Sequence, residues 1–260
     1  MPDTGQSPEI VTVACLTDNY AYLVHDPASG ATAVFDVPEV APIMAALTTR
    51  GWQLSDIVIT HHHDDHIQGV AELRDATGAK VWGAAADAHR LPPLDHALAE
   101  GDRVTIGTLI AHVIDVPGHT IGHVAYHMPA AGAVFTADSL MALGCGRLFE
   151  GSAAQMWDSL QKLAALPPDT LVCSGHEYTA SNARFAMTIE PDNRALISRC
   201  EEIAAARAAG RPTVPAILAT ELATNPFLRA AQPGIARSLG CDGQDPAVVF
   251  ARIRSLKDSF

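Results

Sequence analysis

One short segment carries much of the chemistry of this chain: SDIVITHHHDDHIQG, between Ser55 and Gly69. The apolar run Ile57–Ile59 inside it predicts a buried strand, which ends at Thr60. The six residues that follow are four histidines and two aspartates. Because such side chains are costly to bury and repel one another when protonated, this strand end must lead into a site that uses them.

The spacing within the segment predicts metal ligands in the pattern H-x-H-x-D-H. Side chains two residues apart in an extended chain point to the same side, so His61 and His63 can reach one metal ion. Asp65 and His66 begin the following turn and can point toward a second position nearby. Imidazole suits zinc, and a carboxylate adds a hard oxygen ligand.

Three later segments repeat the arrangement of an apolar strand, a turn and a side chain that can bind metal. They are VIDVPGHTIGH, AVFTADSL and LVCSGHEYT, which contribute His119, Asp138 and His176. Strand ends at one edge of a sheet converge in space, and α/β folds place their sites there. Each residue alone could equally be a cap or a loop residue, but together with the first cluster they predict metal binding.

The other histidines and the cysteines lack this context. His62 and Asp64 face away from the predicted ligands, and His123, close to His119 in sequence, is expected to support one. The remaining histidines are expected to lie at the surface or to pack: His25, His89, His96, His112 and His127. Five scattered cysteines without a C-x-x-C pair argue against a disulfide framework or a Cys-rich zinc module and fit a reducing cytosol.

Hydrophobic periodicity predicts strands interrupted by helices, followed by a helical tail. Strands are expected in these segments: 9–16, 19–26, 32–37, 56–60, 79–84, 102–107, 108–116, 123–128, 133–138 and 170–175. Helices are expected in these segments: 40–51, 67–78, 153–166, 194–210 and 245–260. No convincing strand follows His176, so we place a domain boundary near residue 175, between 1–175 and 176–260.

Composition limits the partners that this chain can have. A formal net charge of -12 repels a nucleic-acid backbone and disfavours anionic membranes. No apolar run is long enough to cross a bilayer, and the opening MPDTGQSPEI lacks the basic and apolar regions of a secretory signal. We therefore expect a cytoplasmic protein that binds neither nucleic acid nor membrane. A monomer is the expected state, with a weak dimer as the alternative, although composition does not fix the oligomeric state.

Along nearly the whole chain, the motifs resemble glyoxalase II, the hydroxyacylglutathione hydrolases of the metallo-β-lactamase superfamily. The resemblance rests on LTDNYAYLV, THHHDDH, VPGHTIGH, FTADSL, GCGRLFEG, SGHEYT and TNPFLR, which occur in that family's order. H-x-H-x-D-H specifies only the superfamily, whereas GCGRLFEG, GHEYT and NPFLR together are more specific. The resemblance implies an α/β fold, in which an αββα metallo-β-lactamase sandwich is followed by a C-terminal α-helical domain that binds glutathione.

The resemblance also implies two divalent metal ions per chain, with zinc as the first expectation and iron or manganese as alternatives. The first ion would be bound by His61, His63 and His119. The second ion would be bound by Asp65, His66 and His176, and Asp138 would bind both ions. Asp65 would in addition orient the attacking nucleophile by a hydrogen bond.

The substrate implied by the resemblance is a glutathione thioester. The residues implied to hold it are Arg147, Phe149, Tyr178, Arg229, Arg254 and Lys257. Phe149 stands where many members have tyrosine, so a hydroxyl contact to the substrate is missing. Gln68 stands where the family usually has glycine, so the turn after the ligands differs from that of the family. For Arg254 and Lys257, a solvated helix face is an equal alternative. Because the chain is strongly acidic, an acidic substrate requires a local basic pocket.

The implied activity is hydrolysis of S-(2-hydroxyacyl)glutathione thioesters, such as S-D-lactoylglutathione, in methylglyoxal detoxification. Two cations that share a water lower its pKa from 15.7 toward roughly 7, and a thiol with a pKa of about 8.5 leaves without a strong general acid. One alternative is a mononuclear-iron glutathione persulfide dioxygenase, which would leave Asp65 and His176 without full metal duties. Another is a non-catalytic metal-binding protein on the same scaffold. A β-lactamase or a nuclease fits the sequence less well.

Overall fold

The computed structural model describes residues 7–260. The segment MPDTGQSPEI was used above to predict that a secretory signal is absent. Its first six residues lie outside the described part of the chain. The described chain forms two compact units. Unit 1 comprises residues 7–115 and Gly122–Phe135, and unit 2 comprises Val116–Ile121 and Thr136–Phe260.

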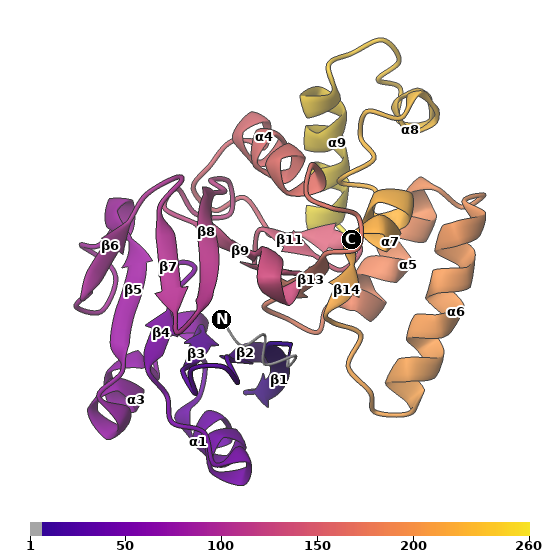
Figure 1. The fold of residues 1–260 in the computed structure, drawn as a ribbon. Coiled ribbons are helices and arrows are strands. Elements are labelled where there is room, and N and C mark those ends of the chain that lie inside the picture. Colours follow the sequence, from indigo (N-terminus) through magenta and orange to yellow (C-terminus); the bar gives the residue numbers. More distant parts are fainter. Residues whose placement is uncertain (1–6) are drawn as a thin grey trace. The chain divides into compact units, whose positions relative to one another are not determined.

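Unit 1 is built on a six-stranded sheet in the order β1-β2-β3-β4-β5-β6 (Figure 1). These strands are β1 Glu9–Cys15, β2 Asn19–His25, β3 Thr32–Phe35, β4 Asp56–Val58, β5 Lys80–Ala84 and β6 His96–Leu98. Pairing is antiparallel from β1 to β3 and parallel from β3 to β6. Parallel neighbours need crossover connections, and helices and short turns supply them. These are α1 Val40–Arg50, α2 Asp64–Ile67, α3 Val70–Thr77 and η1 Ala85–Asp87.

A second, antiparallel sheet packs against the first within unit 1. Its strands there are β7 Arg103–Ile106, β8 Leu109–Asp115, β9 Val124–Met128 and the first part of β10 Ala133–Ala137, with the turn η2 Pro129–Ala131. Phe35 of β3 stacks on Phe135 of β10 with ring centroids 3.7 Å apart, and Tyr126 of β9 lies 5.6 Å from Phe35. These aromatic contacts form the core between the two sheets.

Helices α1 and α3 cover the other face of the first sheet. Ile43 and Leu47 of α1 and Leu73 of α3 are buried in one hydrophobic cluster with Leu23 of β2. Gly51 adopts the left-handed conformation, with φ 67°, that ends α1. The predicted amphipathic helix and its glycine stop are thus confirmed.

Unit 2 is mainly helical. Its helices are α4 Ala153–Ala164, α5 Thr179–Ile189, α6 Arg194–Ala208, α7 Leu218–Thr224, α8 Pro233–Ser238 and α9 Pro246–Asp258. Its strands are the end of β10, the hairpin β11 Leu140–Met141 and β12 Gly144–Cys145, and β13 Leu171–Ser174 and β14 Ala216–Ile217. Next to β13, Gly175 donates its amide to the Ala137 carbonyl of β10 at 3.1 Å.

The expectation that no strand follows His176 is wrong. β14 pairs antiparallel with β13 through Leu171 and Val172. Two residues are too few to show a period-2 alternation, so tertiary contact decides this pairing. The sequence pattern did not predict the two-residue strands β11 and β12 or the three-residue strand β6 for the same reason.

An aromatic core joins the helices of unit 2. The ring centroids of Phe227 and Phe250 are 5.7 Å apart, and those of Phe185 and Phe227 are 6.0 Å apart. Trp157 of α4 lies 6.2 Å from Phe250 of α9. Buried aromatic rings of this kind contribute strongly to packing, so the predicted helical tail has a folded core.

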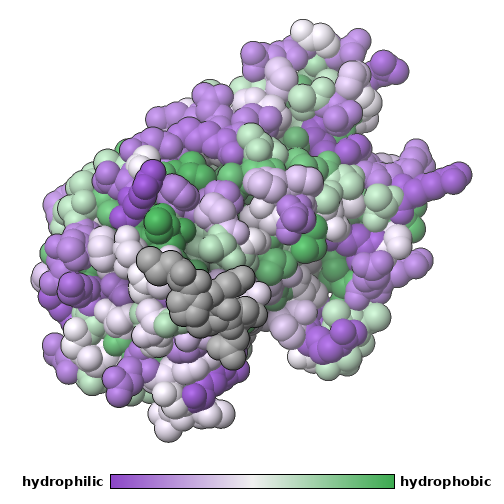
Figure 2. All heavy atoms as spheres, viewed as in Figure 1, coloured by the Kyte–Doolittle hydropathy of each residue, from purple (hydrophilic) through white to green (hydrophobic). Residues whose placement is uncertain are grey.

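Hydrophilic side chains cover much of the face in Figure 2, with apolar residues in patches between them. Among the described residues, no helix is long and apolar enough to cross a membrane. All five cysteines are free, in agreement with the expected lack of a disulfide framework; four are buried and Cys200 is half-buried, as packing residues are.

Candidate functional site

The predicted ligands of unit 1 lie together after β4. His63 is still extended, and α2 begins directly behind it. His61 Nε2 lies 3.1 Å from His63 Nδ1, and the His61 and His66 ring centroids are 4.2 Å apart. His61 and His66 are fully buried, whereas the Asp65 side chain remains 44% exposed. The structure therefore brings these four residues together.

This cluster is held by Asp36, a buried carboxylate that no sequence pattern singled out. Asp36 Oδ2 accepts hydrogen bonds from Thr60 Oγ1 and His66 Nδ1, each at 2.8 Å, and its Oδ1 accepts from the Thr60 amide. Because His66 donates through Nδ1, its Nε2 carries the lone pair that can bind a metal. Asp36 directly follows β3, so the strand-end signal that identified Asp138 could have found it.

Other polar residues near the cluster differ in what they contact. The His123 ring stacks on the His61 ring, with centroids 4.6 Å apart and planes 9° apart. His62 points elsewhere, with Nδ1 3.3 Å from Asp87 Oδ2. Gln68 donates to a backbone carbonyl at 2.8 Å, which secures the turn in which the family usually has glycine.

Unit 2 contains the other three predicted ligands, which converge on one carboxylate. His119 Nε2 lies 3.5 Å from Asp138 Oδ2, and His176 Nε2 lies 3.3 Å from Asp138 Oδ1. All three side chains are buried. His119 Nδ1 is 2.8 Å from the Arg147 carbonyl, which can only accept, so Nδ1 is the donor and Nε2 carries the lone pair.

The chemistry of these donors fits divalent cations. Unit 1 offers three imidazoles and one carboxylate among the predicted ligands, and unit 2 offers two imidazoles and one carboxylate. Mixed nitrogen and oxygen ligation suits zinc, iron and manganese. A cation also stabilises buried imidazole nitrogens and carboxylates at this density, which would otherwise be costly to desolvate.

Two aromatic candidates and one cation lie beside the ligands of unit 2. Phe149 packs edge-on against His119 with ring centroids 5.3 Å apart, and Tyr178 stacks on His176 at 4.6 Å. Phe149 is 60% exposed and Tyr178 is 40% exposed. The Arg147 guanidinium lies 5.7 Å from the Phe149 ring centroid. Each therefore presents surface to a molecule bound near His119 or His176.

Arg254 is not on a solvated face of α9. It is buried and donates from Nη1 to the Cys145 carbonyl at 3.0 Å. Its Nη2 lies 2.9 Å from Asp258 Oδ1, an oxygen that is also 3.9 Å from Arg147 Nε. Asp258 thus connects Arg147 with Arg254, although the two arginines are far apart in sequence.

Lys257, one turn further along α9, lies near two aromatic rings. Its Nζ lies 5.3 Å from the Phe185 ring centroid and 5.2 Å from that of Phe260. Burial, and then the charges of Arg254 and Arg184, lower the pKa of Lys257. In the described part of the chain no carboxylate forms an ion pair with this ammonium, so it can receive an anion.

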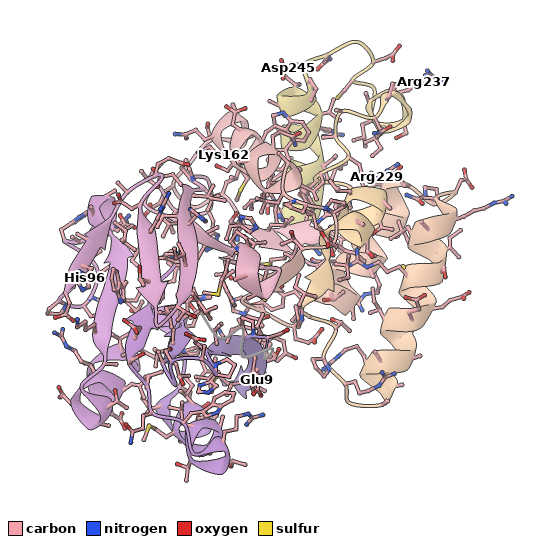
Figure 3. All side chains as sticks on the ribbon, in the orientation of Figure 1. Glu9, His96, Lys162, Arg229, Arg237 and Asp245 are labelled. Atoms are coloured by element: carbon pink, nitrogen blue, oxygen red, sulfur yellow. The ribbon has the colours of Figure 1, made fainter. Side chains whose placement is uncertain are left out.

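Arg229, labelled in Figure 3, is engaged differently from the other predicted substrate contacts. Its Nε and Nη2 donate to the two carboxylate oxygens of Glu190 at 2.7 and 2.9 Å. Its Nη1 donates to the Leu222 carbonyl at 3.3 Å. The structure therefore gathers Arg147, Arg254 and Lys257, with Arg147 and Arg254 sharing a single oxygen of Asp258. The guanidinium of Arg229, in contrast, binds both carboxylate oxygens of Glu190.

Family comparisons cover nearly the whole chain. Residues 16–176 match the Metallo-beta-lactamase superfamily, and residues 177–260 match the Hydroxyacylglutathione hydrolase C-terminus. A relative in Jannaschia sp. (strain CCS1), named hydroxyacylglutathione hydrolase, is 71% identical over 253 residues. The alignment covers 97% of this chain and 99% of the relative.

Solved structures agree with these family matches. The B3 metallo-beta-lactamase BLEG-1 aligns with a TM-score of 0.66 at 22% identity, covering 85% of this chain and 99% of that chain. TTHA1623 in a di-iron-bound form aligns with a TM-score of 0.54 at 32% identity, covering 65% and 91%. The predicted fold class, a metallo-β-lactamase fold with a C-terminal helical domain, is confirmed.

Proposed function

The chain belongs to the hydroxyacylglutathione hydrolase family of the metallo-β-lactamase superfamily, and we propose that it hydrolyses S-(2-hydroxyacyl)glutathione thioesters. The products are glutathione and a 2-hydroxy acid, as in the second step of methylglyoxal detoxification. The observation that carries the proposal is a cluster of histidine and aspartate side chains in each unit, in a chain 71% identical to a relative of that name. Unit 2 adds cations suited to an anionic substrate.

Two metal ions per chain are part of the proposal, with zinc as the first choice. The first ion is assigned to His61, His63 and His119. The second ion is assigned to Asp65, His66 and His176, and Asp138 is assigned to both. The donor types support this assignment, as does the di-iron-bound form of the 32% identical protein TTHA1623. When bound, the ions would supply Lewis acidity and a water of lowered pKa.

The protein's own groups prepare this chemistry. Asp138 presents one oxygen toward His119 and the other toward His176, as a bridging carboxylate would. Asp65 accepts a hydrogen bond from Asn19 Nδ2 at 3.1 Å, which fixes the carboxylate that we propose orients the nucleophile. The leaving thiolate, with a parent pKa of about 8.5, needs no strong general acid.

The cations of unit 2 would hold the glutathione moiety, which carries two carboxylates and one ammonium. Arg147, Arg254 and Lys257 form a local basic region in a chain of net charge -12. Tyr178 and Phe149 add exposed aromatic surface, and Phe149 lacks the hydroxyl that tyrosine would offer. Arg229 was predicted as a further contact, and in this proposal it reaches substrate only by releasing Glu190.

The remaining assignments concern the organisation of the protein. We propose a catalytic domain at 1–175 and a substrate-binding domain at 176–260. The protein would act as a cytoplasmic monomer, without nucleic-acid or membrane partners. The strong acidity supports the exclusion of nucleic acid and anionic membranes.

The test is hydrolysis of S-D-lactoylglutathione by purified protein, with metal quantified in the same sample. We expect turnover that follows metal content and is lost after chelation. Oxygen consumption with glutathione persulfide is the assay for the alternative dioxygenase. Oxygen uptake without thioester hydrolysis would overturn the proposed function, and metal binding with neither activity would indicate a binding protein.

A further inference from the structure

The β11–β12 hairpin and the residues up to Arg147, called here the hairpin loop (residues 140–147), connect Asp138 with Arg147. Side chains from other parts of unit 2 hold most of its carbonyls. Asn225 donates to the carbonyls of Met141 and Gly144, and Asn182 donates to that of Ala142. Arg254 donates to the carbonyl of Cys145, and His119 donates to that of Arg147. The conformation of this loop is therefore set by segments distant in sequence rather than by its own short strand pairing.

One backbone position in the hairpin loop is unfavourable by itself. Leu143 is fully buried and has φ 56°, a conformation that non-glycine residues rarely adopt. Its amide donates to Glu221 Oε2 at 2.8 Å, and the fully buried Glu221 is paired with Arg199. Asn225 Nδ2 donates to the same Glu221 oxygen at 3.1 Å. Asn225 and Glu221 thus hold the strained residue from one side.

The far end of the hairpin loop touches two proposed ligands. A Cβ on Gly146 would lie 2.0 Å from the Asp138 carbonyl oxygen and 2.8 Å from His119 Nδ1. The next residue, Arg147, accepts the His119 Nδ1 hydrogen bond with its carbonyl. A shift of this backbone would therefore rotate or release the His119 ring and move the Arg147 side chain.

We propose that Asn225 is a positioning residue for both parts of the site. Its side-chain amide holds the hairpin loop so that the Arg147 carbonyl orients His119 and the Arg147 guanidinium faces the substrate. Asn225 itself touches neither metal nor substrate. The inference rests on the proposed function, because it takes His119 as a ligand and Arg147 as a substrate contact.

Asn225→Asp tests the donor role. The variant keeps the side-chain volume and the Oδ1 atom that accepts from the Phe227 amide at 3.0 Å. It removes the donors to the hairpin loop and places a carboxylate against carbonyl oxygens and Glu221. Asn193→Asp is the matched control, because Asn193 caps α6 through Oδ1 and donates from Nδ2 to Ala223 without touching the loop.

Three measurements separate positioning from general stabilisation. In metal-free Asn225→Asp, the amides of Leu143 and Gly146 should exchange hydrogen faster than in wild type, while those of β1 to β5 do not change. Zinc affinity, measured by chelator competition, should fall by up to roughly 10–100-fold, the usual cost when a ligand such as His119 loses its orienting partner, here the Arg147 carbonyl. KM for S-D-lactoylglutathione should rise as well. The Asn193→Asp control should change none of these.

A second variant covers the case in which Asn225→Asp does not fold. Asn182→Asp removes only the donor to Ala142 and should give the same pattern of changes at smaller size. Unchanged exchange in the hairpin loop, or faster exchange with wild-type zinc affinity, would overturn the inference. If wild-type protein hydrolyses no thioester, the proposed function fails, while exchange and zinc affinity still decide how Asn225 acts on His119.

Discussion

Two clusters of side chains in this protein are suited to ligands of opposite charge. The donor cluster of unit 1 contains His61, His63, Asp65 and His66, and it is suited to a cation. The cation cluster of unit 2 contains Arg147, Arg254 and Lys257 around Asp258, and it is suited to an anion. In a chain of net charge -12, the cation cluster is a local exception to the field of the protein.

The two clusters also differ in how they are held. The donor cluster is contiguous in sequence, and the three hydrogen bonds that Asp36 accepts leave it little freedom. The cation cluster combines a loop residue with one face of α9, and two aromatic rings lie near Lys257. Changes in the first cluster should therefore affect metal binding and kcat, whereas changes in the second should affect mainly KM.

The largest effect is expected for Asp138→Ala, which removes the carboxylate between His119 and His176. Loss of a direct ligand should reduce metal affinity and turnover by more than about 100-fold, beyond the cost of losing an indirect partner. Elemental analysis and a thioester assay measure both. The control is Asp245→Ala, which removes only an α9 cap, worth about 0.5–2 kcal/mol. Wild-type metal content in Asp138→Ala would reduce Asp138 to a strand cap.

Asp36→Asn tests how the donor cluster is held. The change weakens the acceptor for His66 Nδ1, and metal affinity should fall roughly 10–100-fold with KM little changed. Asp26→Asn is the matched control, since Asp26 is also buried in unit 1 and its carboxylate accepts from Ala28, Ser29 and Thr108, none of which is a predicted ligand. The control should lose stability but bind metal normally. Equal metal loss in both variants would mean that Asp36 acts through stability alone.

Lys257→Ala tests the cation cluster. A charge-assisted contact to a glutathione carboxylate contributes about 1.5–3 kcal/mol, so KM should rise roughly tenfold or more at constant metal content. Arg229→Ala should raise KM less, because Glu190 already occupies that guanidinium, and should lower thermal stability instead. Steady-state kinetics and melting curves of both variants decide the order. A larger rise in KM for Arg229→Ala than for Lys257→Ala would indicate that Arg229, rather than Lys257, binds the glutathione carboxylate.

The smallest effect concerns the pH dependence of the cation cluster. Burial, then Arg254 and Arg184, lower the pKa of Lys257 below the ordinary lysine value of about 10.4. KM should therefore begin to rise at a lower pH than for an ordinary lysine, and Lys257→Arg should delay that rise. At a pH between the pKa of Lys257 in the folded chain and its pKa in the unfolded chain, the unfolded chain binds more protons. The free energy of unfolding therefore increases as pH rises through this range. Urea unfolding of wild type and Lys257→Met over this range should show that difference; identical pH slopes would contradict it.

Local patterns carried much of the prediction. Period-2 geometry places His61 and His63 on one side of an extended segment, and the strand-end rule singled out Asp138, which the structure places between two histidines. Helix α1 with its stop at Gly51 followed from apolar spacing and glycine chemistry. Such features depend on neighbours within a few residues, so the chain itself specifies them.

Other features arise only when distant segments meet. Asn225 reaches the carbonyl of Met141, Asp36 reaches His66, and Arg229 pairs with Glu190, all across long stretches of chain. Such side-chain hydrogen bonds leave no periodic trace in the sequence, because their geometry depends on how sheets and helices pack. The sequence by itself specified the metal-binding residue types and their spacing, and its resemblance to a family predicted which cations would meet an anion. Tertiary structure alone decided which supports orient them, and which arginine binds both oxygens of a protein carboxylate.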